Sequence, residues 1–130
     1  MALVISFCIA LSDPEADEFN GIVRHIIKKS LFTERQVEII LRQRRRLGPG
    51  LGISRGAYYR QAAQSREKIE RLYYTVSLLR GLGVLESRDI GVMSDLAEKI
   101  GELKSSDVPP DREVDITSVL DKIVSQACKT

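Results

Sequence analysis

The chain has 130 residues, 43% of them hydrophobic and 29% charged, a composition typical of one globular domain and not of a disordered chain. Two distant cysteines, Cys8 and Cys128, and one histidine, His25, argue against a zinc cluster or a disulfide framework and favour an intracellular protein. No apolar run approaches the roughly 18–20 residues of a membrane-spanning helix, so we expect no membrane partner and a cytoplasmic location.

Charge is distributed unevenly along the chain. The net charge is +2, yet residues 24–82 contain fourteen Lys or Arg and only four Asp or Glu. Residues 1–23 and residues 83–130 each have a net charge of −4. A concentrated positive region between acidic ends is typical of a protein that binds a polyanion.

The first predicted elements are an apolar segment and a helix. Residues 2–11 have no basic residue before them, which favours a segment of the fold, a strand or a buried helical turn, over a signal peptide. Asp13 and Pro14 have the residue types that begin a helix, and apolar residues at helical spacing extend it to about Ser30. Residues 1–30 are therefore predicted to serve packing or dimerisation.

The second helix has the clearest start in the sequence. Thr33 and Gln36 have the spacing of a capping box, and Phe32 and Val37 flank it as a hydrophobic staple. The glycines and the proline of residues 48–52 cannot continue a helix, so we expect this one to end near residue 47.

The third segment, residues 54–81, begins with a capping serine and carries two patterns. Apolar or small residues repeat at alternating spacings of four and three: Tyr58, Ala62, Ser65, Ile69, Leu72, Val76 and Leu79. Long polar donors follow the opposite face: Arg60, Gln64, Lys68 and Arg71. Such donors can contact base edges and phosphates in a major groove, although a solvated helix face is the alternative interpretation.

The remaining elements are less clearly marked. Residues 84–93 contain two short apolar runs around a polar centre, which predicts a two-stranded wing. Ser94 is expected to cap a helix, residues 105–115 form a proline-containing linker, and a last helix begins near Ile116. We expect residues 94–130 to add C-terminal helices to the core.

Three short motifs resemble a known class of domain. Residues 31–40 (LFTERQVEII) resemble the opening helix of sigma-factor region-4-type helix–turn–helix domains. Residues 65–69 (SREKI) are similar to the start of their recognition helix, and residues 79–85 (LRGLGVL) to the end of a winged-helix recognition helix. The resemblance implies a winged helix–turn–helix core over residues 31–93, of the small prokaryotic or archaeal transcription-regulator type. It also implies sequence-specific binding of double-stranded DNA, usually as a homodimer on a palindromic site.

The sequence departs from that pattern at two positions. Tyr59 stands where the first helix usually has a small residue, and Ala63 where the turn usually has a glycine. Residues 54–81 are therefore either two helices joined by a turn or one continuous helix, and both interpretations stay open at this point.

The functional prediction is DNA binding by a mainly α protein with a winged helix–turn–helix core. Residues predicted to hold phosphates are Arg42, Arg44, Arg45, Arg46 and Arg55. Residues predicted to face bases or backbone are Arg60, Gln64, Arg66, Glu67, Lys68 and Arg71. No nucleophile–base set, carboxylate pair or metal cluster is visible, so we expect no enzyme, metal or cofactor. The alternatives are a helical self-assembly or protein-interaction module, and an RNA-binding module.

Overall fold

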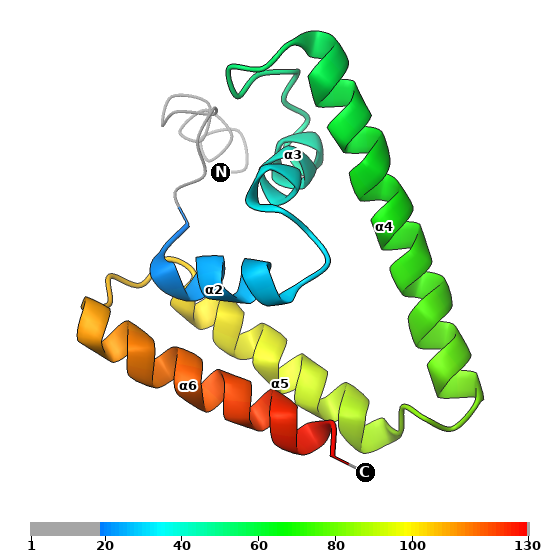
Figure 1. The fold of residues 1–130 in the computed structure, drawn as a ribbon, viewed down its shortest axis with the longest axis vertical. Coiled ribbons are helices and arrows are strands. Elements are labelled where there is room, and N and C mark those ends of the chain that lie inside the picture. Colours follow the sequence, from blue (N-terminus) through cyan, green and yellow to red (C-terminus); the bar gives the residue numbers. More distant parts are fainter. Residues whose placement is uncertain (1–18, 130) are drawn as a thin grey trace, which may run out of the picture.

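The structure, a computed structural model, describes residues 19–129, and no strand occurs in that range (Figure 1). The expected mainly α class is thereby confirmed. The helices are α2 (Gly21–Lys29), α3 (Glu34–Arg44), α4 (Arg55–Gly81), α5 (Ser87–Leu103) and α6 (Pro110–Ala127). The apolar segment 2–11 and the helix start at Asp13 and Pro14 lie outside the described residues.

The helices are arranged in two parts around an open triangular outline (Figure 1). Helices α5 and α6 form a hairpin, and α2 packs against both of them. Helix α3 packs against α2 on one side and against α4 on the other. Among the described helices α4 packs only against α3, and its C-terminal end is joined to α5 by a hydrogen bond from the Arg80 guanidinium to the Ser87 hydroxyl.

Helix α2 begins later than the sequence suggested. Asn20 has an extended backbone (φ −72°, ψ 172°), and its side chain accepts a hydrogen bond from the Val23 N–H. The same side chain donates to the carbonyl of Leu103 at 2.7 Å, which ties this cap to the end of α5. The helix that the sequence extends to about Ser30 therefore begins at Gly21, after its cap Asn20, and ends at Lys29.

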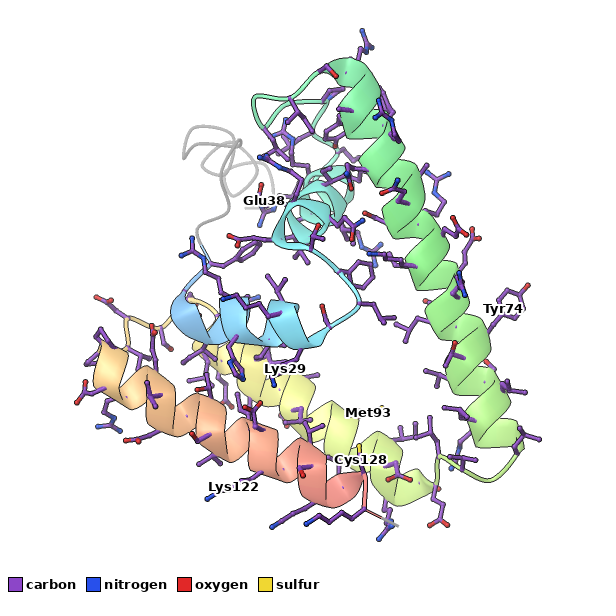
Figure 2. All side chains as sticks on the ribbon, in the orientation of Figure 1. Lys29, Glu38, Tyr74, Met93, Lys122 and Cys128 are labelled. Atoms are coloured by element: carbon purple, nitrogen blue, oxygen red, sulfur yellow. The ribbon has the colours of Figure 1, made fainter. Side chains whose placement is uncertain are left out.

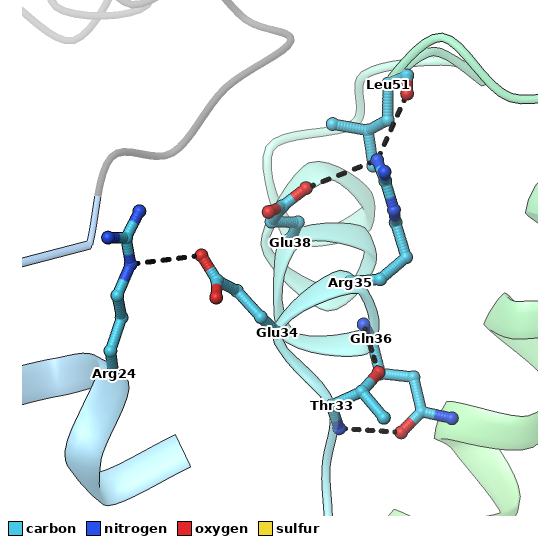
Figure 3. Close-up of polar contacts among 7 residues, drawn as sticks. All are labelled: Arg24, Thr33, Glu34, Arg35, Gln36, Glu38 and Leu51. Atoms are coloured by element: carbon cyan, nitrogen blue, oxygen red, sulfur yellow. Dashed lines mark hydrogen bonds and ion pairs between the residues drawn. The ribbon is translucent and has the colours of Figure 1, made fainter. Parts of the chain in front are cut away.

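Helix α3 confirms the predicted capping box. The Gln36 N–H donates to the Thr33 hydroxyl at 3.2 Å, and the Thr33 N–H donates to the Gln36 side-chain oxygen at 3.1 Å (Figure 3). Both bonds satisfy backbone donors that the first turn of a helix leaves without partners. Inside the helix, Ile39 is fully buried against Tyr58 and Ala62 of α4, and these three side chains form the small core between the two helices.

Helix α4 is one continuous helix of 27 residues, so the two-helix interpretation is wrong. Ser54 caps it as expected, accepting from the Ala57 N–H. Ser65, expected to cap a recognition helix, is buried within α4, where its hydroxyl donates to the Gln61 carbonyl at 2.8 Å. The regular four-and-three stripe explains the result, because Tyr58, Ala62 and Ser65 can all face α3 only if the helix has no break.

The predicted wing at residues 84–93 is absent, since α5 already begins at Ser87. Glu86 and Asp89 cap that start reciprocally, each side chain accepting from the other's backbone N–H. The apolar residues of this stretch follow helical spacing as well as strand alternation, and the cap selects the helix. Ser94, expected to cap a helix, lies inside α5 instead.

The connection between α5 and α6 is shorter than the predicted linker. Helix α6 begins at Pro110 and not near Ile116, so only residues 104–109 lie between the two helices. Proline suits the first position of a helix because it has no N–H to leave unpaired and its φ is already helical. Helix α6 is also joined to α2: the Nε2 atom of His25 on α2 lies 2.9 Å from a carboxylate oxygen of Asp121 on α6.

Candidate nucleic-acid interface

The fold separates the charges of the sequence in space. Residues 31–82, which include α3 and α4, contain eleven Lys or Arg and four Asp or Glu; we call this part the basic body. Residues 83–129, with α5 and α6, contain six basic and ten acidic residues. Within residues 19–129, α4 packs against neither α5 nor α6 and touches α5 through the Arg80–Ser87 hydrogen bond, so most of the positive charge lies on a part of the molecule that the acidic hairpin does not cover.

Basic side chains gather where α3 ends and α4 begins, at the top of the view in Figure 2. We call the following residues the basic corner: Arg44, Arg45, Arg46, Arg55 and Arg60. All five side chains are exposed. Within residues 19–129, no ion pair joins Arg44, Arg46, Arg55 or Arg60 to a carboxylate. Arg44, Arg46, Arg55 and Arg60 therefore provide positive charge at the surface that no carboxylate of the described residues pairs with.

Arg46 is held at the corner by an unusual backbone conformation. Its φ is 57°, in the left-handed region that favours glycine. The Leu47 N–H donates to the Arg42 carbonyl and the Arg46 N–H donates to the Gln43 carbonyl, which is the Schellman pattern that ends a helix. An arginine at this position costs about 1 kcal/mol relative to glycine, so the charge is kept at the expense of local stability.

The first turn of α4 places a basic side chain at the end of the helix that already carries partial positive charge. Arg55 is its first residue, and its first turn contains no acidic residue. Helix N-termini carry a partial positive charge, so a guanidinium there is unfavourable unless an anion lies near it. A phosphate at the corner would be stabilised by both the helix terminus and the arginines.

Arg42 does not belong to this surface, contrary to the sequence prediction. Its side chain is buried, and both Nε and Nη2 donate to the Gly48 carbonyl, at 3.0 and 2.6 Å. A Cβ added at Gly50 would lie only 2.8 Å from the Arg42 Nη2. Arg42 therefore supports the loop between α3 and α4 and cannot reach a phosphate without leaving that position.

Lys68 also has a different role from the predicted one. Its ammonium group donates to the Leu31 carbonyl and to the Gln36 side-chain oxygen, each at 2.7 Å, and lies 5.8 Å from the centre of the Phe32 ring. Lys68 thus fastens the middle of α4 to the turn between α2 and α3. It lies on the flank of α4 and not on the outward face where the sequence spacing placed it.

The other predicted residues of α4 fall on two surfaces. Arg60, Gln64, Glu67 and Arg71 are exposed and share the side of the helix opposite the α3 contact. Arg66 lies on a flank, in a groove of about 400 Å³ between α3 and α4. The groove is lined by Ile40, Gln43, Arg44, Arg66, Ile69 and Glu70. The structure therefore brings Arg66 next to Arg44, and separates it from the outward face.

Two contributors to this surface were not identified from the sequence. Gln43 lines the groove beside Arg44 and Arg66, and it has the amide group that can pair with a base edge. Arg35 donates to the Leu51 carbonyl at 3.1 Å and lies 3.6 Å from a carboxylate oxygen of Glu38 (Figure 3). On α2, Arg24 forms an ion pair with Glu34. Arg35 therefore supports the loop from below, a role that no spacing in the sequence indicates because its partner is 16 residues away.

Other kinds of site find no support in residues 19–129. That range contains no group of three or more His, Cys, Asp or Glu side chains placed to hold a metal ion. Its helices also include none with the length and hydropathy needed to cross a bilayer.

Comparison with known proteins adds no family to these observations. No protein-family model matches the chain, and no curated protein and no solved structure matches it at a significant level.

Proposed function

We propose that this protein binds double-stranded DNA through the basic corner and the adjoining outward face of α4, and that it acts as a transcription regulator. The observation that carries the proposal is a group of four exposed arginines that form no ion pair with a carboxylate of residues 19–129: Arg44, Arg46, Arg55 and Arg60. Neutralising DNA phosphates releases counterions, which makes such a surface favourable for binding a duplex. The glycine-favouring conformation of Arg46 and the cationic first turn of α4 fit the same anionic partner.

The mode of binding differs from the one implied by a helix–turn–helix. Because α4 is continuous and α3 covers one side of its N-terminal half, its outward face is the surface available to a groove. In this proposal Arg44, Arg46 and Arg55 hold phosphates, and Gln64 and Arg71 reach toward bases or backbone. Two copies would place two such surfaces on a duplex, which retains the expectation of a homodimer on a symmetric site.

The test is a gel-shift titration of the full chain with random duplex DNA over a series of salt concentrations. If about six phosphates are neutralised, log K falls with log salt with a slope near −5. Competition with duplex RNA and with single strands checks the preference for duplex DNA. A slope near zero, or stronger competition by RNA, would contradict the proposal.

A pair of double variants locates the surface. Replacing Arg55 and Arg60 by Ala should make the salt slope shallower by about 2, since two phosphate contacts are lost. Replacing Arg88 and Arg112 by Ala changes the net charge equally but on α5 and α6, and should leave the slope unchanged. Equal effects of the two variants would show that net charge alone, and not the basic corner, determines binding.

The second candidate function is helical self-assembly, which is favoured by one specific observation. The C-terminal half of α4 exposes several large apolar side chains that no described helix covers. The two functions are compatible because they use different halves of the same helix.

A further inference from the structure

The C-terminal half of α4 lacks charge over eight consecutive residues, from Leu72 to Leu79. A helix segment without charged residues is normally covered by a neighbour, yet among the described helices α4 packs only against α3, and its end bonds to α5 through Arg80 and Ser87. Tyr73 is 72% exposed and Tyr74 is 79% exposed. The surface of the isolated chain therefore holds aromatic groups that water solvates poorly.

Three exposed apolar side chains near the end of α4 form a continuous ridge. Tyr74, Leu78 and Leu82 follow one another at intervals of four residues, which places them along one face of the helix and its C-cap. They continue the outward face that begins with Arg60 and Arg71. Figure 2 shows the labelled Tyr74 directed away from the rest of the molecule, so nothing in the described chain blocks access to the ridge.

We propose that a second copy of this chain covers the ridge, so that two α4 helices cross near Leu78 in a reversible homodimer. Ridges of residues four apart interdigitate in the commonest class of helix packing, at a crossing angle of about −50°. A pair related by a two-fold axis brings the same residues of both copies together, and the ridge offers the apolar side chains that such a contact needs.

The exposed area fits a reversible dimer. From the exposed fractions of Tyr74, Leu78 and Leu82, the ridge exposes roughly 400 Å² per copy. Two copies therefore offer about 800 Å², which is the size of a weak, transient contact and not of a permanent interface. Association through this face is accordingly expected to depend on protein concentration.

The charge pattern favours a second copy at this place on α4. Two copies approaching through the N-terminal half would oppose Arg60 and Arg71 to their own equivalents, which is unfavourable. Between Arg71 and Arg80 no charge is present, so like surfaces can meet without repulsion. Arg80 itself is directed to its own chain, where it donates to the Leu85 carbonyl and the Ser87 hydroxyl.

Crossing near Leu78 also keeps the basic corners apart. From Arg55 to Leu78 the helix rises by about 35 Å, so each corner lies far from the crossing point and the two helices diverge from it. The proposed dimer depends on the exposed apolar ridge of α4 and on the absence of charge there, and it does not require that the basic body binds DNA.

The experiment is sedimentation equilibrium of the full chain, without nucleic acid, over a wide range of protein concentration. The wild type should shift from the monomer mass of 14.6 kDa toward twice that mass as concentration rises. Leu78→Asp should remain monomeric at every concentration, because pairing would oppose two carboxylates in an apolar contact. Far-UV circular dichroism of each variant establishes that the helices are retained.

A matched control places the new charge elsewhere. Val114 on α6 is 64% exposed, about as much as Leu78 at 60%, so Val114→Asp should dimerise as the wild type does. A wild type that stays monomeric, or a Leu78→Asp variant that still dimerises, overturns the proposal. Equal weakening by the two aspartates would also overturn it.

A cross-linking experiment gives a second readout. In a chain with Cys8 and Cys128 replaced by Ser, Leu78→Cys should form a disulfide-linked dimer on mild oxidation, whereas Val114→Cys should not. Cross-linking only at position 114 would place the contact on α6 and refute the α4 crossing. Since these experiments contain no DNA, their failure leaves the salt-dependent DNA test intact, and failure of that test leaves the dimer intact.

Discussion

Two basic residues two positions apart on α3 have opposite environments. Arg42 is buried and its guanidinium donates to the Gly48 carbonyl, whereas Arg44 is exposed at the basic corner. Burying a guanidinium is costly unless its hydrogen bonds are satisfied, so Arg42 is committed to the loop that it supports. Lys68 is committed in the same way by its bonds to Leu31 and Gln36. Within residues 19–129, Arg44, Arg46, Arg55 and Arg60 are exposed and have no such bonds, so they are available to a polyanion.

Replacing Arg46 tests both its left-handed backbone conformation and its proposed contact with DNA. Arg46→Gly should raise the free energy of unfolding by about 0.5–1 kcal/mol, because glycine adopts the left-handed conformation at the end of α3 without strain. The same change should weaken DNA binding, since a phosphate-facing guanidinium is lost. Urea unfolding and gel shift measure the two effects. A stabilised variant with unchanged affinity would show that Arg46 is not part of the interface.

At the scale of the element, α4 combines two helix halves with different surroundings. Its N-terminal half is covered on one side by α3 and carries arginines on the other, while residues 72–79 carry no charge and no described helix packs against them. The helix ends at a Schellman motif in which Gly83 has a φ of 80° and the Val84 N–H donates to the Leu79 carbonyl. The continuous helix α4 thus connects the proposed DNA-binding surface to the proposed dimer contact.

The continuity of α4 predicts the sign of one substitution. Ala63 is exposed on the helix, at the position where a helix–turn–helix would have its turn glycine. Within a continuous helix, Ala63→Gly should lower the free energy of unfolding by about 1 kcal/mol, because glycine loses more backbone entropy than alanine. In a turn with positive φ the same change would stabilise the protein. Thermal or urea unfolding distinguishes the two signs.

The whole molecule is open, with few residues fully removed from water. Among residues 19–129 the buried apolar side chains are Ile22, Ile27, Ile39, Tyr58, Ala62 and Leu120. Burial of apolar surface is the main favourable contribution to folding, so a monomer with this small core is expected to have modest stability. Contacts between copies would add to it.

If contacts between copies stabilise the fold, the melting temperature should rise with protein concentration. A partner that binds the folded state and not the unfolded state stabilises the folded state by mass action. Differential scanning calorimetry of the wild type at increasing concentration should show the rise, and Leu78→Asp should abolish it. A melting temperature that is independent of concentration for the wild type would mean that no folded-state association contributes to stability.

Local interactions made part of this structure predictable from the sequence. The capping box of Thr33 and Gln36, the serine cap at Ser54 and the stop at Gly83 depend on residues within one turn of each other, so their residue types suffice. The wing failed as a prediction because short apolar runs fit helix and strand equally, and the cap formed by Glu86 and Asp89 decided between them.

Composition and neighbouring residues suffice to predict that positive charge is concentrated between two acidic regions and that Thr33 and Ser54 cap helices. Which basic side chains remain at the surface depends on contacts between distant segments, because the partners of Lys68 lie 32 and 37 residues away. Long-range packing also makes residues 55–81 one helix, since packing of a single stripe against α3 outweighs any local tendency to turn.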